Sequence, residues 1–246
     1  MDGSIVLMRK HANDNIAMRG GWTIPRHARK KSITGIYHVI MRGINRQSIF
    51  EDEEDYEKYI DTLSSFKIIN EYEIYAYCLM KNHCHLLLKV GKDDLDLVVK
   101  RIAGSYVYWY NLKYRRCGHL FQVRYKSEAV EDDQYLFTLI RYIHQNPLKA
   151  GLYKSVSEYK HSSYGEYVAE YPRLVDVSFA FSITDKDSFI KFNNENTTVC
   201  FMDIFKEARR INDADGTAII QSVSNCANAS KFQSPDTSLR NRFIKE

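Results

Sequence analysis

Apolar residues recur along most of the chain with the spacings of strands and helices. Short runs rich in apolar and aromatic residues predict strands over residues 36–41, 74–79, 83–88 and 127–130. Helical spacing after acidic residues predicts helices beginning at 51–55, 93–94 and 132–133, the last ended by Pro147. After about residue 165 the periodicity weakens, and only 186–194 and 201–211 indicate helices.

The order of these elements is β-α-β-β-α-β-α, which is typical of a ferredoxin-like split βαβ sandwich with one additional helix. The sequence therefore predicts an α+β fold: an antiparallel sheet with helices on one face, followed by a mostly helical C-terminal extension. We divide the chain into a flexible leader (1–24) with a turn at Gly20-Gly21, a main domain (25–165) and the extension (166–246).

Composition narrows the class of protein. The chain has 246 residues, of which 44% are hydrophobic and 27% are charged, as in globular proteins. No apolar stretch resembles a membrane span or a signal peptide, so we expect no membrane association. The five cysteines form no CxxC pair, which favours a reducing cytoplasm over a disulfide framework. The net charge is +4, but basic residues gather in the first 46 residues and again around 113–126, as in proteins that bind phosphate backbones.

Two histidines separated by one residue are the most informative chemical feature. His83 and His85 begin a predicted strand, and alternate side chains of a strand share a face, so both imidazoles point the same way while Cys84 points the other way. Two neighbouring imidazoles can share one metal ion. Packing or ordinary hydrogen bonding is the alternative that the residues alone leave open.

The third predicted helix carries a second stripe beside its apolar one. Residues four apart lie on one helix face, so Tyr142 and Asn146 can present a hydroxyl and an amide oxygen toward one point. The chain contains 18 tyrosines, and spacing alone does not choose Tyr142 over Tyr135 or over the cluster at 106–110.

At these residues the chain resembles a known family. Asn82-His83-Cys84-His85 resembles the HUH motif of single-tyrosine DNA nucleases, in which a hydrophobic residue separates two histidines. The segment 141–151 (RYIHQNPLKAG) resembles the YIHxNPxxAG signature of IS200-like transposases, in particular the REP-associated tyrosine transposases. Supporting matches occur at 25–29, 121–127 and 162–164, so the resemblance covers about 25–165. Cys84 replaces a bulkier hydrophobe, and we expect no loss from this because buried cysteine behaves as a small hydrophobe.

The resemblance implies an enzyme of DNA transposition and recombination that cleaves and rejoins single-stranded DNA. Tyr142 is then the nucleophile that forms a 5′-phosphotyrosine link, and His83, His85 and Asn146 hold Mg²⁺ or Mn²⁺. The base that takes the phenol proton is not identified. The implied partner is single-stranded DNA from a hairpin or repeat, and the basic residues expected to bind it are Arg29, Lys30, Lys31, Arg42, Arg46, Arg124 and Lys126.

Two other functions compete with this interpretation. One is a decayed transposase that binds DNA without cutting it, and the other is a non-catalytic nucleic-acid-binding module on the same sandwich. We expect a bacterial cytoplasmic, nucleoid-associated protein that acts as a monomer or homodimer. The extension shows no recognisable helix-turn-helix, so the recognised DNA sequence is not predicted.

Overall fold

The computed structural model describes residues 29–122 and 124–195. The described residues belong to one compact unit. The predicted leader (1–24) and the predicted helix at 201–211 lie outside the described residues. The domain boundaries at 24/25 and 165/166 stay predictions.

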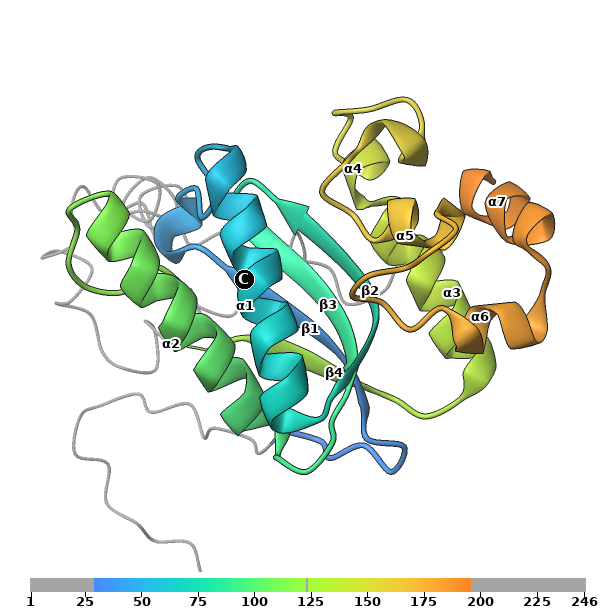
Figure 1. The fold of residues 1–246 in the computed structure, drawn as a ribbon, viewed down its shortest axis with the longest axis horizontal. Coiled ribbons are helices and arrows are strands. Elements are labelled where there is room, and N and C mark those ends of the chain that lie inside the picture. Colours follow the sequence, from blue (N-terminus) through green and yellow to red (C-terminus); the bar gives the residue numbers. More distant parts are fainter. Residues whose placement is uncertain (1–28, 123, 196–246) are drawn as a thin grey trace, which may run out of the picture. The chain divides into compact units, whose positions relative to one another are not determined.

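The centre of the described unit is a four-stranded antiparallel sheet with the order β2-β3-β1-β4 (Figure 1). Its strands are β1 (Ile36–Arg42), β2 (Glu73–Met80), β3 (His83–Lys89) and β4 (Lys126–Val130). Strand β3 therefore lies between β1 and β2, the arrangement of a split βαβ unit. The predicted ferredoxin-like α+β fold is confirmed, and each of the strands predicted from apolar runs is present.

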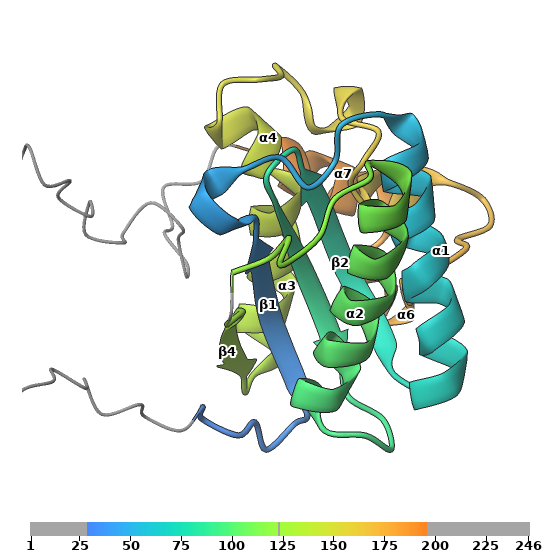
Figure 2. The ribbon, with the colours of Figure 1, turned by 90° about the vertical axis from the view of Figure 1, so that its left-hand side faces the viewer.

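Two helices, α1 (Glu53–Asn70) and α2 (Leu95–Lys113), cover one face of this sheet (Figures 1 and 2). Helix α1 begins with a capping box in which the Asp52 carboxylate accepts a hydrogen bond from the Asp55 amide. The Tyr59 hydroxyl of α1 lies 3.2 Å from Cys84 Sγ and 3.7 Å from Met41 Sδ. The side chains of Met41 and Cys84 therefore point toward this layer, and they form part of its buried core.

The third long helix, α3 (Asp133–His144), lies on the opposite face of the sheet (Figure 1). His85 follows Cys84 on β3, so its side chain points away from α1, and it contacts the ring of Tyr142 on α3. The two helices of the split βαβ sandwich, α1 and α2, therefore share one face as predicted, and the additional helix α3 covers the other face. The reason is that the apolar stripe of α3, which is buried as predicted, covers the second apolar face that the strands present. This stripe consists of Leu136, Leu139, Ile140 and Ile143.

Helix α3 starts as the acidic signal predicts and ends three residues before the proline. The Asp132 carboxylate accepts a hydrogen bond from the Tyr135 amide, as an N-cap does. The helix ends at His144, and a separate helical turn, α4 (Asn146–Lys149), follows with Pro147 in its first turn. Pro147 therefore starts a new turn, because its missing N–H costs nothing at that position.

Strand β2 forms one edge of the sheet, and the segment that follows α4 covers this edge. The amides of Leu79, Ser163 and Asp176 make backbone hydrogen bonds across this edge, to the carbonyls of His161, Tyr77 and Ile74 respectively. Helices α5 (Tyr164–Val168), α6 (Ser178–Ile183) and α7 (Lys186–Asn194) belong to this layer, and the helix predicted at 186–194 is confirmed. Covering an edge strand in this way prevents it from pairing with another chain.

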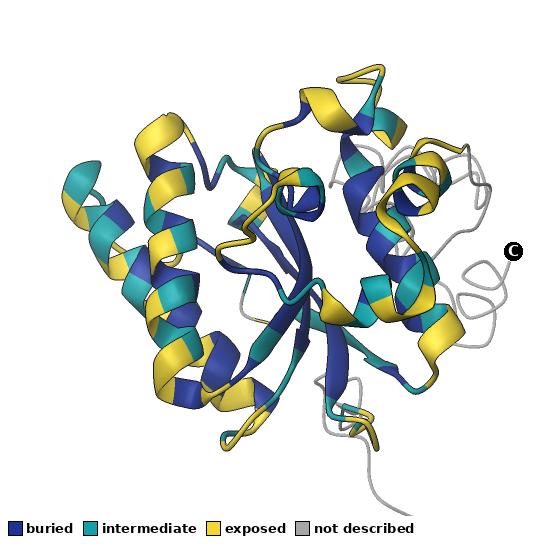
Figure 3. Cartoon of the chain, turned by 45° about the vertical axis from the view of Figure 1, so that its right-hand side comes forward, coloured by how far each residue is buried: buried dark blue, intermediate teal, exposed yellow. Residues whose placement is uncertain are grey.

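The strands are mostly buried (dark blue in Figure 3), whereas the outer faces of the helices are exposed (yellow). Cys78 and Cys84 are buried free thiols, and Cys117 is an exposed one. Within residues 29–122 and 124–195, no helix is both long enough and apolar enough to cross a bilayer.

Candidate active site

The two histidines of the NHCH segment lie side by side on the sheet face that α3 covers. Their ring centroids are 5.2 Å apart, and His83 and His85 are only 8% and 1% exposed. Strand β3 extends through both residues, so alternation places them on one face and Cys84 on the other, as the sequence predicts. The pair is buried beneath α3 and does not face solvent.

Each of the two imidazoles is held at the same ring nitrogen. Nδ1 of His83 lies 2.7 Å from the amide oxygen of Asn82, and Nδ1 of His85 lies 3.0 Å from Nε2 of His38. An amide oxygen only accepts, so Nδ1 of His83 carries the hydrogen and its Nε2 is the basic nitrogen. Nε2 of His85 is buried and makes no hydrogen bond within the described structure.

Burial keeps His38 and His85 neutral. It lowers the pKa of His38 to about 3. The pKa of His85 also falls well below its usual value, first because of burial and then because His38, His83 and Lys149 would repel its positive charge. Metals bind the neutral imidazole, so this environment suits a ligand role at neutral pH. A buried basic nitrogen at His85, beside a second imidazole, fits a divalent cation.

Tyr142 lies against the histidines, on the face of α3 that meets the sheet. Its ring centroid is 6.1 Å from that of His38 and 6.1 Å from that of His85, with interplanar angles of 79° and 78°. The side chain is 4% exposed, and Nζ of Lys149 lies 4.2 Å from the ring centroid. The structure therefore brings together the histidine pair and the tyrosine of the family signature.

The other tyrosines that the sequence left open have different surroundings. The hydroxyl of Tyr135 bonds the Glu128 carboxylate, and burial together with this bond raises the pKa of Tyr135. The Tyr106 hydroxyl donates to the Ile49 carbonyl at 2.6 Å, and its ring packs on Tyr59 of α1. Tyr106 thus belongs to the layer on the opposite side of the sheet from the histidines.

Asn146, the predicted third ligand, opens the α4 turn. Its Nδ2 donates to the carbonyls of Tyr142 and Ile143 at 3.0 and 3.4 Å, so its Oδ1 faces away from the α3 backbone. Among residues 29–122 and 124–195, no group of three or more His, Cys, Asp or Glu side chains gathers in the manner of a metal site. Asn146 has an amide side chain, so it is not one of the four residue types in that description.

Sequence reasoning missed two residues of this site, His38 and Lys149. His38 is a fully buried imidazole with apolar or aromatic neighbours on both sides in β1, and that exception was a signal for it. Lys149 stands in the signature segment seven residues after Tyr142, which is two helical turns. The positions of His38 and Lys149 in the sequence do not show that they contact this site, because β1, α3 and α4 meet only through the tertiary fold.

Six of the seven predicted DNA-binding residues fall into two groups. Two of them share the sheet face of the histidines: the β-sheet register pairs Arg42 with His83, and it pairs Lys126 with Ile40, which is also the partner of His85. Arg42 is buried rather than exposed. Four others are exposed side chains: Lys30, Lys31, Arg46 and Arg124.

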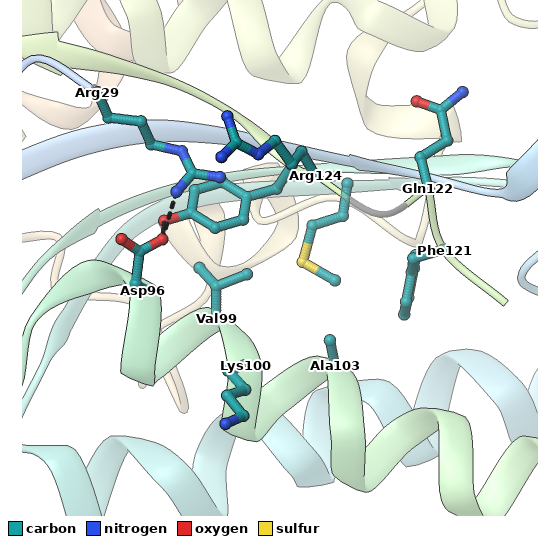
Figure 4. A pocket seen from close by; sticks show the side chains of 10 residues that line it. Arg29, Asp96, Val99, Lys100, Ala103, Phe121, Gln122 and Arg124 are labelled. Carbon is teal, nitrogen blue, oxygen red and sulfur yellow. Dashed lines mark hydrogen bonds and ion pairs between the residues drawn. The ribbon is translucent and has the colours of Figure 1, made fainter. Parts of the chain in front are cut away.

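Arg29, the seventh predicted residue, makes contacts within the protein. It forms an ion pair with Asp96 and lies 3.8 Å from the ring centroid of Tyr125, whose hydroxyl donates to Asp96 at 2.6 Å. Figure 4 shows this ion pair at the end of a pocket that Arg124 also lines. One face of the Tyr125 ring is thus covered by Arg29. Arg29 and Arg124 share this pocket.

Comparisons with known proteins agree with the resemblance. Residues 31–146 match the family model described as "Transposase IS200 like". A Haemophilus influenzae protein named "Putative REP-associated tyrosine transposase" is 26% identical in an alignment 105 residues long, which covers 38% of this chain and 59% of that protein. The chain therefore matches less than two thirds of that relative's length. A solved structure of a REP-associated tyrosine transposase bound to a REP hairpin shares the fold, with a TM-score of 0.53 and 21% identity, over 60% of this chain and 87% of that one.

Proposed function

We propose that this chain is an IS200-like transposase that cleaves and rejoins single-stranded DNA through a covalent 5′-phosphotyrosine intermediate on Tyr142. The match of residues 31–146 to the IS200-like family model supports this proposal. The observation that carries this proposal is the contact of the Tyr142 ring with His85, a buried imidazole whose Nε2 has no hydrogen-bond partner among the described residues. A nucleophile beside a nitrogen that can bind a metal is the arrangement that metal-assisted phosphoryl transfer requires.

His83 and His85 would hold one Mg²⁺ or Mn²⁺ ion, with the amide oxygen of Asn146 as a further ligand. Imidazole ligands favour Mn²⁺, and oxygen ligands suit both ions. When bound, the ion supplies Lewis-acid chemistry that neutralises charge on the scissile phosphate. Asn82 keeps a hydrogen on Nδ1 of His83, which leaves Nε2 as its ligating nitrogen.

The role of Tyr142 follows from the balance of bonds. Its hydroxyl oxygen forms a bond to phosphorus while the bond from phosphorus to the 3′-oxygen breaks. The phenol loses a proton and the leaving 3′-oxygen gains one, so the products are a phosphotyrosine ester and a free 3′-OH. Because the ester conserves the energy of the phosphodiester, a second DNA 3′-OH can attack it and reseal the strand without ATP.

Single-stranded DNA, from a hairpin or a repeat, is the proposed partner. The relative with a solved structure is described as bound to a REP hairpin, and the family match supports DNA as the substrate here. Arg42 and Lys126 lie on the sheet face of the histidines, so they are the basic residues best placed to meet a phosphate at Tyr142. We further propose that the chain acts as a monomer or homodimer in a bacterial cytoplasm, on the nucleoid.

The decisive experiment looks for the covalent link. Single-stranded oligonucleotides with hairpins from the DNA flanking the gene are labelled at the 3′ end, since the strand 3′ of the cut is the one that becomes attached. With Mn²⁺ or Mg²⁺ we expect a labelled protein band from the wild type and from Tyr135→Phe, but none from Tyr142→Phe. Peptide mapping then locates the nucleotide.

The same experiment separates the competing functions. DNA binding without any adduct from the wild type would favour a decayed transposase or a non-catalytic binding module. A labelled band from Tyr142→Phe as strong as that of the wild type would show that another residue is the nucleophile. Either result contradicts the proposal.

A further inference from the structure

A third imidazole lies behind the predicted metal pair. Nε2 of His38 is 3.0 Å from Nδ1 of His85, and the two rings are nearly parallel, with an interplanar angle of 16°. His38 is 0% exposed and lies diagonally across the β1–β3 pair from His85. The motif that carries the family resemblance does not include His38.

The hydrogen between these two nitrogens belongs to one ring or the other. A neutral imidazole has one donor and one acceptor nitrogen, so either His85 donates from Nδ1 or His38 donates from Nε2. The outer nitrogens, Nδ1 of His38 and Nε2 of His85, are both buried without a hydrogen-bond partner among the described residues. Each arrangement thus leaves one buried N–H and one lone pair without a partner. The two arrangements therefore make the same number of hydrogen bonds among the described residues.

Only one of the two arrangements lets His85 bind a metal. If His38 donates, Nε2 of His85 carries a hydrogen and has no lone pair to offer. If His85 donates, its Nε2 is the basic nitrogen. The same logic already holds at His83, where the amide oxygen of Asn82 accepts from Nδ1 at 2.7 Å.

We propose that His38 is a positioning residue that accepts the Nδ1 hydrogen of His85 and thereby holds His85 in the tautomer whose Nε2 binds the metal. This inference rests on the proposed metal site. Asn82 and His38 then have equivalent tasks at the two ligands. An amide from the residue just before the strand orients one imidazole, and a histidine from the neighbouring strand orients the other.

The geometry separates this task from that of a third ligand. The two nitrogens of an imidazole point to opposite ends of the ring, so an ion at Nε2 of His85 lies on the far side of that ring from His38. Nε2 of His38 is already directed at Nδ1 of His85. His38 therefore acts through His85 rather than on the ion.

The test uses the full-length chain and three variants. His38→Phe removes the acceptor and keeps a ring, whereas His38→Gln keeps an acceptor near the position of Nε2. His161→Phe is the matched control, because His161 stacks on Tyr56 in the layer of α1 with ring centroids 3.6 Å apart, away from the histidine pair. Mn²⁺ binding is measured without DNA by the electron paramagnetic resonance signal of the free ion, and thermal melting checks that each variant folds.

We expect His38→Phe to weaken Mn²⁺ binding about 10- to 100-fold, the usual effect of losing a partner that orients a metal ligand. His38→Gln should recover most of that loss, and His161→Phe should bind as the wild type does. Equal losses from His38→Phe and His38→Gln would show that His38 is itself a ligand, which would overturn the inference. Unchanged binding by a folded His38→Phe would overturn it as well.

Imidazole NMR on the wild type gives an answer that does not depend on any variant folding. In ¹⁵N-histidine protein with Zn²⁺ as a diamagnetic probe, we expect the shared hydrogen to show its one-bond coupling to Nδ1 of His85. A one-bond coupling to Nε2 of His38 instead would contradict the inference.

Failure of the inference differs from failure of the proposed function. If His85→Ala and His83→Ala bind Mn²⁺ as tightly as the wild type, the metal site itself is wrong. If those two variants lose binding and His38→Phe does not, only the role of His38 is wrong.

Discussion

His144 and Asn193 are joined by a 2.8 Å hydrogen bond between Nδ1 and Oδ1, and this bond ties α3 to α7. Nδ2 of Asn193 donates to the Phe189 carbonyl, so its Oδ1 accepts the hydrogen from Nδ1 of His144. Nε2 of His144 then lies 2.8 Å from the Ser163 hydroxyl, which can donate to it. Residues two apart on a helix point to nearly opposite sides, so this buried network holds the far side of α3 while Tyr142 faces the sheet.

The first prediction concerns the dependence of stability on pH. Burial lowers the pKa of His144 from 6.5 to about 4. The unfolded chain therefore takes up a proton between these two values while the folded chain does not, and the free energy of unfolding falls as pH falls from 6.5 to 4. His144 alone should account for a loss of roughly 3 kcal/mol across this range. Urea unfolding at several pH values measures it.

The control for this prediction is His144→Gln, which cannot titrate. Its unfolding free energy should fall less steeply with pH than that of the wild type over the same interval. Parallel curves would mean that His144 titrates normally in the folded protein.

The second prediction concerns His83 and His85, the two proposed metal ligands. His83→Ala and His85→Ala should each abolish cleavage of single-stranded DNA, since each removes a proposed metal ligand. His85 is the more deeply buried, so His85→Ala should also lower the melting temperature, and His83→Ala should do so less. Cleavage assays in Mg²⁺ beside thermal melts separate the two effects, and full cleavage by His83→Ala would rule out the site.

The third prediction concerns binding of the DNA backbone. The affinity for single-stranded DNA should fall with the logarithm of salt concentration by a slope of roughly −0.7 for each phosphate contact. Lys30 and Lys31 are exposed, so replacing both by Gln should flatten the slope by about 1.4 if each touches a phosphate. Arg29 is engaged by Asp96 and should contribute less. Fluorescence anisotropy over a salt series measures the slopes.

Lys154→Gln with Lys160→Gln is the matched control for that experiment, because both side chains are exposed and neither belongs to the predicted DNA-binding set. An equal change of slope in this pair would indicate a general effect of net charge rather than contacts at Lys30 and Lys31.

The fourth prediction concerns the start of the helix that carries Tyr142. The Asp132 carboxylate accepts from the Tyr135 amide at 2.7 Å, so Asp132→Ala should lower the free energy of unfolding by about 1 kcal/mol. Asp132→Ser keeps a capping oxygen and should recover most of this loss. The neighbouring Asp133→Ala loses only its interaction with the helix dipole and should cost a few tenths of a kcal/mol. Denaturant unfolding of the three variants checks the order.

Local patterns in the sequence determined the elements of this protein and one part of its site. Period-two and period-3.6 spacing located the strands and helices, and acidic caps such as Asp132 located helix starts, because these signals depend on residues close together in the chain. Alternation along a strand was also enough to place His83 and His85 on one face. Each of these conclusions concerns neighbours in sequence.

Tertiary structure decided which residues meet across elements. Tyr106 lies in the layer on the opposite side of the sheet from the histidines, and only the packing of α3 on the sheet shows that the Tyr142 ring contacts His85. His38 is 47 residues from His85, and only the pairing of β1 with β3 brings their nitrogens to 3.0 Å. Contacts between distant segments are set by the packing of whole layers, which buries apolar faces and so fixes what each polar side chain touches.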